Sequence, residues 1–106
     1  MTRTVHDPME QLRDILEEQF QRHTDELTEL TVRSRRPGHG GYDRDTLAAL
    51  IAAASRGVAD TAQALRRMAD GTYGFCERCA VRIPVERLEI LPHARFCVPC
   101  QRSRTG

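Results

Sequence analysis

Four cysteines, the only ones in this 106-residue chain, lie near its C-terminal end as two Cys-x2-Cys pairs. Cys76 and Cys79 form the first pair and Cys97 and Cys100 the second, with 17 residues between the pairs. A Cys-x2-Cys turn brings two sulfurs to within about 2.3 Å of one metal ion, and a second such turn completes a tetrahedron. Because four thiolates leave no coordination position for water, the spacing predicts one structural Zn²⁺ rather than a hydrolytic one.

Two other chemistries also use paired cysteines. A thioredoxin-like redox dithiol sits where a strand leads into a helix, and neither pair lies in such a pattern. An iron–sulfur cluster can take four cysteine ligands as well, although its known motifs prefer other spacings. Both stay as alternatives to zinc at this point.

Charge and apolar content narrow the class of protein. The formal net charge is +1, so bulk electrostatics give no argument for non-specific nucleic-acid binding. The N-terminal sequence MTRTVHDPMEQLRD lacks the apolar core of a secretory signal. No window approaches the roughly 18 apolar residues of a membrane-spanning helix. We therefore expect a cytoplasmic protein without membrane contact, in a compartment that keeps thiols reduced.

A long amphipathic helix is predicted ahead of the cysteines. Asp7 suits its N-cap, and Pro8 suits its first position, which needs no backbone N–H donor. One row of residues recurs every seven positions and consists of Met9, Leu16, His23 and Leu30. A second row, Phe20 and Leu27, lies four residues after Leu16 and His23, and the two rows form a seam along the helix. Because charged residues fill most positions between them, this narrow seam is typical of a coiled coil.

A second helix follows a turn. Pro37 and the three glycines after it end the first helix, and Asp43 or Asp45 is placed to cap the next one. Its seam also repeats every seven positions, through Leu47, Ala54, Thr61 and Met68. Gly71 provides a stop just after the last helical residues.

The two helices, each of about 25–28 residues and roughly 40 Å long, should fold back on each other. The predicted fold class is mainly α: an antiparallel two-helix coiled-coil hairpin over residues 7–70, with a tip loop at about 35–45. A small four-cysteine zinc finger follows over residues 71–101. Residues 1–6 and 102–106 are expected to be flexible tails. We expect a monomer, and a helical pair within a larger bundle completed by oligomerisation is the alternative.

The finger segment GTYGFCERCAVRIPVERLEILPHARFCVPCQ resembles the DksA/TraR C4-type zinc finger. The features in common are Gly71, Tyr73, Gly74, Cys76, Cys79, Ile83, Arg87, Leu88, Pro92, Ala94, Cys97, Cys100 and Gln101. The resemblance covers about 30 residues and is specific, because it joins the metal spacing to several positions that are not ligands.

The resemblance implies a bacterial transcription regulator that binds RNA polymerase rather than DNA and is not an enzyme. Members of the family insert the coiled-coil hairpin into the polymerase secondary channel, while the zinc region docks at the rim. The tip then approaches the catalytic centre and changes the lifetime of promoter complexes, in some members together with the alarmone ppGpp.

The predicted hairpin tip departs from the family pattern. The best-known members carry the acidic motif Asp-x2-Asp-x-Ala there. The corresponding segment VRSRRPGHGG holds Arg33, Arg35 and Arg36 and no acid. Asp43 and Asp45 follow it, either as caps of the second helix, which we favour, or as a shifted acidic tip. Magnesium would repel the arginines, whereas phosphates or acidic polymerase loops would attract them, so these five residues form the predicted partner-binding tip.

Two further departures concern the finger and the length of the chain. Ala80 stands where many family fingers have glycine, so a left-handed turn there would cost about 1 kcal/mol. The chain also ends six residues after Cys100, whereas longer members add a C-terminal helix and an N-terminal extension that can bind ppGpp. This difference counts against a response to ppGpp.

Two other classes of function compete with polymerase binding. A direct nucleic-acid binder or a protein-interaction adaptor would use the arginine-rich turn. The helices carry at least as many acids as bases, however, and no strip of basic and aromatic residues is evident. For an enzyme, the chain offers no Ser-His-Asp order, no open metal site and no phosphate-binding glycine loop with its lysine.

Overall fold

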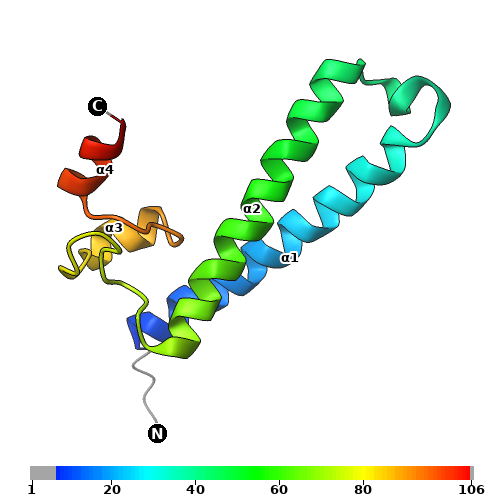
Figure 1. Ribbon diagram of the computed structural model, residues 1–106. Coiled ribbons are helices and arrows are strands. Elements are labelled where there is room, and N and C mark those ends of the chain that lie inside the picture. Colours follow the sequence, from blue (N-terminus) through cyan, green and yellow to red (C-terminus); the bar gives the residue numbers. More distant parts are fainter. Residues whose placement is uncertain (1–6, 106) are drawn as a thin grey trace, which may run out of the picture.

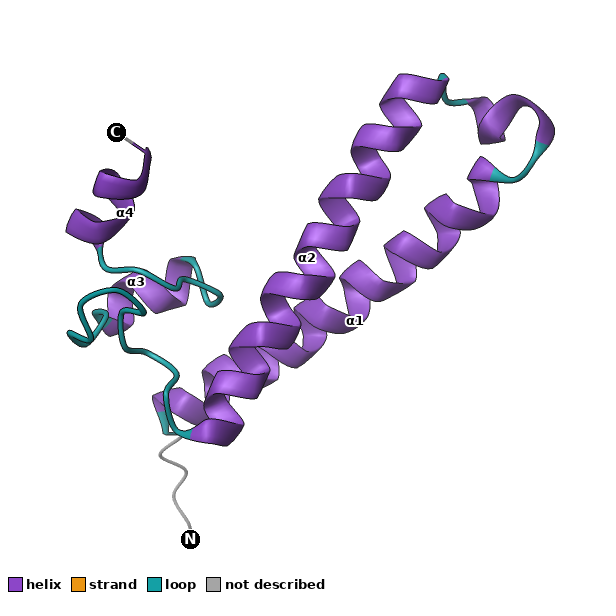
Figure 2. Ribbon diagram, viewed as in Figure 1, coloured by secondary structure: helices purple, strands orange, loops and turns teal. Residues whose placement is uncertain are grey.

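The structure, a computed structural model, describes residues 7–105. Two long helices, α1 (Pro8–Ser34) and α2 (Arg44–Asp70), lie antiparallel and form a hairpin (Figure 1). A 3-10 turn, η1 (Pro37–Gly41), lies between them, and the C-terminal part holds α3 (Val85–Ile90) and α4 (Val98–Thr105). Figure 2 shows helices joined by loops, and residues 7–105 contain one isolated β-bridge, between Phe75 and Arg82. The predicted mainly α fold class is confirmed.

Each long helix begins after an aspartate that caps it, and α2 ends at a glycine. The Asp7 carboxylate accepts a hydrogen bond from the Met9 N–H at 3.1 Å, and that of Asp43 accepts one from the Thr46 N–H at 2.7 Å. Gly71 ends α2 in the left-handed conformation at φ 80°, which glycine adopts without steric cost. Each helix therefore has 27 residues and is roughly 40 Å long.

Two apolar clusters form the core along the hairpin. The cluster nearer the tip consists of Leu30, Leu47 and Ala54. The cluster at the base includes Leu12 and Leu16, of which Leu16 is fully buried. The seven-residue spacing predicted for α2 places Leu47, Ala54 and Thr61 in the interior.

Between the two clusters lie His23 of α1 and Gly57 and Thr61 of α2. A Cβ atom added at Gly57 would lie 2.6 Å from the Cγ and Nδ1 atoms of His23. Only glycine therefore leaves room at this position of α2 for the imidazole ring as it is placed. Thr61 is 1% exposed and donates its hydroxyl hydrogen to the Gly57 carbonyl at 2.7 Å.

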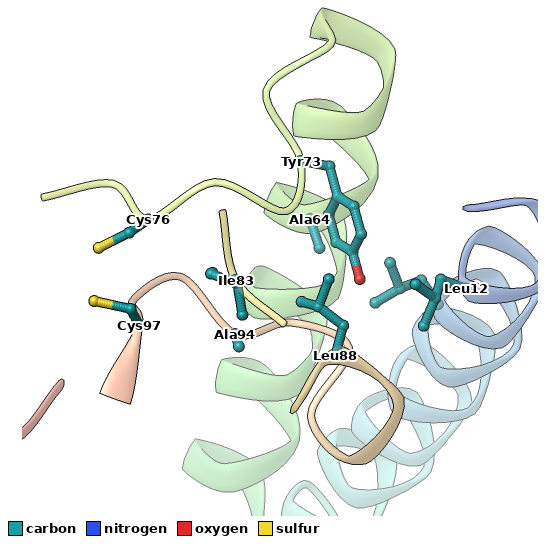
Figure 3. Packing of buried hydrophobic residues seen from close by; sticks show 9 residues of the cluster. Leu12, Ala64, Tyr73, Cys76, Ile83, Leu88, Ala94 and Cys97 are labelled. Atoms are coloured by element: carbon teal, nitrogen blue, oxygen red, sulfur yellow. The ribbon is translucent and has the colours of Figure 1, made fainter. Parts of the chain in front are cut away.

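The finger packs against the base of the hairpin rather than forming a separate unit (Figures 1 and 3). The base cluster joins residues of both parts: Leu12, Leu16 and Ala64 from the hairpin, and Tyr73, Cys76, Ile83, Leu88, Ala94 and Cys97 from the finger. The molecule measures 52 × 46 × 21 Å along its principal axes. Folding of the finger and packing of the hairpin base are therefore coupled.

The C-terminal end differs from the expected tail. Residues 102–105 continue α4, which runs to Thr105. The Gln101 N–H donates to the Cys97 carbonyl at 2.9 Å, so the second cysteine pair itself forms the start of this helix. The guanidinium carbon of Arg104 lies 4.6 Å from the centroid of the Phe96 ring. Residues 1–6 and Gly106, also predicted to be in tails, lie outside the described residues.

Membrane insertion has no candidate among the helices that the structure describes. None of them combines the length and the apolar content that a membrane span requires.

Candidate metal centre and hairpin tip

The four cysteines converge at the end of the finger. Their sulfur atoms all lie within 4.8 Å of one another. The Cys79 and Cys97 sulfurs are 3.7 Å apart, and a tetrahedron with bonds of about 2.3 Å has edges of about 3.8 Å. Figure 3 shows the side chains of Cys76 and Cys97 side by side, with both sulfurs pointing to the same side. The chemistry and spacing of this donor set therefore fit one zinc ion.

Short backbone turns hold the first cysteine pair. The Ala80 N–H donates to the Cys76 carbonyl at 2.9 Å, and the Cys76 N–H donates to the Val81 carbonyl at 2.8 Å. The Glu77 N–H donates to the Arg95 carbonyl at 2.8 Å and so ties this turn to the second one. Ala80 has φ 66°, so the left-handed conformation suggested by the glycine of related fingers is present.

The thiols differ in how readily they ionise. Burial opposes the charge on Cys76, but backbone N–H groups of Cys79, Cys97 and Arg78 donate to its sulfur and lower its pKa to about 6. The pKa of Cys100 rises to about 12, because of its hydrogen bond with Cys97 and its burial. Four thiolates this close together repel one another, so a divalent cation is needed for all four to be charged together.

Glu77 links the finger to α2. Its carboxylate accepts hydrogen bonds from Arg95 at 3.1 and 3.0 Å and lies 3.2 Å from the Arg67 guanidinium. Arg67 also donates to the carbonyls of Thr72 and Phe75, at 2.8 and 2.7 Å. Hydrogen bonds from Arg95, followed by the charges of both arginines, hold the Glu77 pKa below its usual range. Sequence reasoning missed this network because no motif marks it.

Several positions shared with the resembling family have structural roles. The buried Tyr73 hydroxyl donates to the Pro92 carbonyl at 2.8 Å, and burial raises the pKa of Tyr73 to about 12. Arg87 donates through Nε to the Phe96 carbonyl at 3.3 Å. These contacts pin the segment between the cysteine pairs, so the shared positions shape the finger rather than contribute ligands.

Arg33, one of the five predicted tip residues, is engaged within the tip. Its guanidinium donates to the Gly40 carbonyl at 3.3 Å and pairs with Glu29 at 3.2 Å. It also lies 5.7 Å from the centroid of the Tyr42 ring. This arginine therefore braces the tip loop against α1.

The other four predicted tip residues are exposed. Arg35 caps the C-terminus of α1 and Arg36 precedes η1, and neither forms an ion pair with any residue that the structure describes. Asp43 caps α2, as we favoured, and hydrogen bonds from the Thr46 N–H and hydroxyl lower its pKa. Asp45 lies in the first turn of α2.

Known proteins resemble the chain most clearly over the finger. The model of the prokaryotic dksA/traR C4-type zinc finger matches residues 71–106. General stress protein 16O of Bacillus subtilis is 54% identical over 39 residues, which are 37% of this chain and 24% of that protein. The RNA polymerase-binding transcription factor DksA of Escherichia coli is 40% identical over 37 residues, 35% of this chain and 24% of that protein. The matched segment thus spans about a quarter of the length of these relatives.

One solved structure shows the same overall fold. The transcription factor DksA2 from Pseudomonas aeruginosa superposes with a TM-score of 0.73 at 24% identity, covering 92% of this chain and 83% of that one. The hairpin and finger are thus arranged as in that protein. The sequence match, the clustered thiols and the contacts of the shared positions all fall in the same segment, so the finger of this chain is similar to the prokaryotic DksA/TraR C4-type zinc finger and its four cysteines support one structural zinc ion.

Proposed function

We propose that this chain is a transcription regulator that binds RNA polymerase and inserts its hairpin into the secondary channel. In this proposal Cys76, Cys79, Cys97 and Cys100 are the ligands of the zinc ion. The Escherichia coli relative is named an RNA polymerase-binding transcription factor, and the shared finger supports the same partner for this chain. The chain itself would act by binding, as a monomer in the cytoplasm, without catalysing a reaction.

One observation carries the proposal: the finger and the base of the hairpin share one apolar cluster. This cluster fixes the direction of a hairpin roughly 40 Å long relative to the finger. An element that enters a channel needs such a fixed base, because a hinged hairpin would lose conformational entropy on insertion. Two packed helices, each about 10 Å across, form a slender rod suited to a channel.

The composition of the tip distinguishes this chain from members with an acidic tip. Asp43 is engaged in capping α2, whereas Arg35, Arg36 and Arg44 are exposed. A tip of this charge would not bring a free pair of carboxylates to the catalytic magnesium. We therefore expect an effect on transcription initiation that differs from the effect of an acidic tip.

Binding of the zinc-loaded chain to purified bacterial core polymerase tests the proposal. Affinity would be measured at low and high salt, with and without a competing secondary-channel protein such as DksA. We expect saturable binding that the competitor abolishes. Failure to bind at low salt with the zinc retained would refute polymerase binding, and binding that the competitor leaves unchanged would refute the channel as the site.

A parallel gel-shift series with DNA and RNA tests the main alternative, direct nucleic-acid binding. A protein that binds phosphates loses affinity steeply as salt rises. We expect no shift at physiological salt. A salt-dependent shift in the absence of polymerase would favour the alternative.

A further inference from the structure

The carboxylate of Glu77 joins α2 to both cysteine turns. One of its oxygens accepts a hydrogen bond from Arg95 Nε at 3.1 Å and one from Gln63 Nε2 at 3.4 Å, and lies 3.2 Å from a guanidinium nitrogen of Arg67. The other oxygen accepts from Arg95 at 3.0 Å. Gln63 and Arg67 are four residues apart on α2, so they lie on the same face of that helix.

The position of Glu77 depends on the two cysteine turns. Glu77 directly follows Cys76, and Arg95 lies two residues before Cys97. The Glu77 N–H donates to the Arg95 carbonyl at 2.8 Å, in addition to the side-chain hydrogen bonds. With the four thiolates gathered around one metal ion, the two turns are held together and the carboxylate is held in place with them.

Arg67 transmits this position to the hairpin. It lies in the last turn of α2, and its guanidinium also donates to the carbonyls of Thr72 and Phe75, at 2.8 and 2.7 Å. These bonds hold the linker between α2 and the first cysteine turn. Hydrogen bonds weaken steeply when their angle changes, whereas apolar contacts are non-directional. The polar network therefore resists small rotations of the hairpin that the apolar base cluster tolerates.

Partial burial gives this network more weight than a surface ion pair. The Arg67 side chain is 14% exposed and the Glu77 side chain 23%. Exposed pairs contribute little to stability, but removing one member of a partly buried pair leaves the other charge without its counterion. The two hydrogen bonds from Arg95 further restrict the orientation of the carboxylate.

We propose that Glu77 is a positioning residue that couples zinc occupancy to the direction of the hairpin. With the cysteine turns held together around the metal, Glu77 meets Gln63 and Arg67, and the hairpin has one direction relative to the finger. Once the turns separate, Arg67 loses its counterion and the hairpin can rotate about the linker. Because such coupling is reciprocal, the contacts that α2 makes with Glu77 also stabilise the bound metal.

The zinc affinity of the full-length chain, measured by competition with a chromogenic chelator, tests this reciprocity. Arg67→Gln removes the contact from α2, and Arg66→Gln makes the same change of charge at an exposed neighbour. Glu77→Gln and Glu89→Gln form a second pair, in which Glu89 is exposed in the finger. We expect affinity to fall about tenfold for Arg67→Gln and Glu77→Gln, and less than about twofold for the two controls. An affinity that Arg67→Gln leaves unchanged, or that Arg66→Gln lowers equally, would overturn the proposal.

The double variant Arg67→Gln/Glu77→Gln separates coupling from two independent structural roles. Residues that act through one another have non-additive effects. We therefore expect the double variant to lose no more zinc affinity than Glu77→Gln alone, about tenfold. A loss of about a hundredfold, the product of two independent effects, would show that the residues do not act as one unit.

Distances between two spin labels on the zinc-loaded chain report the direction of the hairpin. Labels carried by a ketone-bearing unnatural residue at the exposed positions Ala49, in α2, and Ser103, in α4, leave the cysteines untouched. At equal zinc content, we expect one narrow distance distribution for the wild type and Glu89→Gln, and a distribution about twice as wide for Glu77→Gln. Equal widths would mean that the apolar cluster alone fixes the direction, and the proposal would fail. Both measurements use the free protein, so neither outcome depends on polymerase binding.

Discussion

Substituting Ala80 with glycine should stabilise the protein. Ala80 has φ 66° in the first cysteine turn, and the left-handed region costs a residue with a Cβ atom about 1–2 kcal/mol. Glycine removes this cost but loses about 0.5–1 kcal/mol more backbone entropy on folding. The expected net gain is about 0.5–1 kcal/mol. For a domain of this size, such a gain raises the melting temperature by about 2–8 °C.

Thermal unfolding of the zinc-loaded chain, followed by circular dichroism, measures this gain. One transition is expected, because the finger and the hairpin base share a cluster. Ala59→Gly is the matched control: Ala59 is exposed in the interior of α2, where glycine costs about 1 kcal/mol relative to alanine. The two substitutions should therefore shift the melting temperature in opposite directions. A fall for Ala80→Gly as large as that for Ala59→Gly would refute the left-handed turn.

Three further outcomes follow from the fold. Removal of zinc with a chelator should unfold the finger and lower the melting temperature of the hairpin, since the two share a cluster; an unchanged melting curve would contradict this coupling. Leu16→Ala should cost about 2–5 kcal/mol in the free energy of unfolding measured with urea, whereas Ile15→Ala, at an exposed neighbour, should cost less than about 1 kcal/mol. Equal costs would argue against burial of Leu16. Gly57→Ala should destabilise the hairpin although alanine is the better helix former, and adding His23→Ala should remove the penalty; a gain in stability from Gly57→Ala alone would contradict the close packing.

Short-range spacing explains what the sequence could predict. The two cysteine pairs specify a zinc site because each turn is built from consecutive residues. The caps at Asp7 and Gly71 act within one helical turn, so they too could be predicted from the sequence. The seven-residue seam predicted the interior face of α2 because helix geometry alone sets that face.

Contacts between segments distant in sequence explain what could not be predicted. The packing of His23 on Gly57 depends on how the two helices cross, which no periodicity encodes. The pairing of Arg67 with Glu77 depends on the path of the linker after α2. The hydrogen bond from Arg33 to the Gly40 carbonyl could not be predicted, because nothing in the sequence shows that the loop folds back onto this guanidinium.

The helix at the C-terminal end, where a flexible tail was predicted, was missed for a different reason. A short polar segment after the last cysteine gives little sign of helix. The turn of the second cysteine pair, however, already places the backbone in helical geometry, and α4 continues from it. Starting a helix is the costly step, and the cysteine turn supplies that start.

An electron cryomicroscopy map of the zinc-loaded chain bound to core RNA polymerase tests the central claim most directly. The account predicts density for two antiparallel helices inside the secondary channel, with the finger at its rim and the arginine-bearing tip toward the catalytic centre. A map that places the hairpin outside the channel, or one in which only the finger contacts the polymerase, would contradict it.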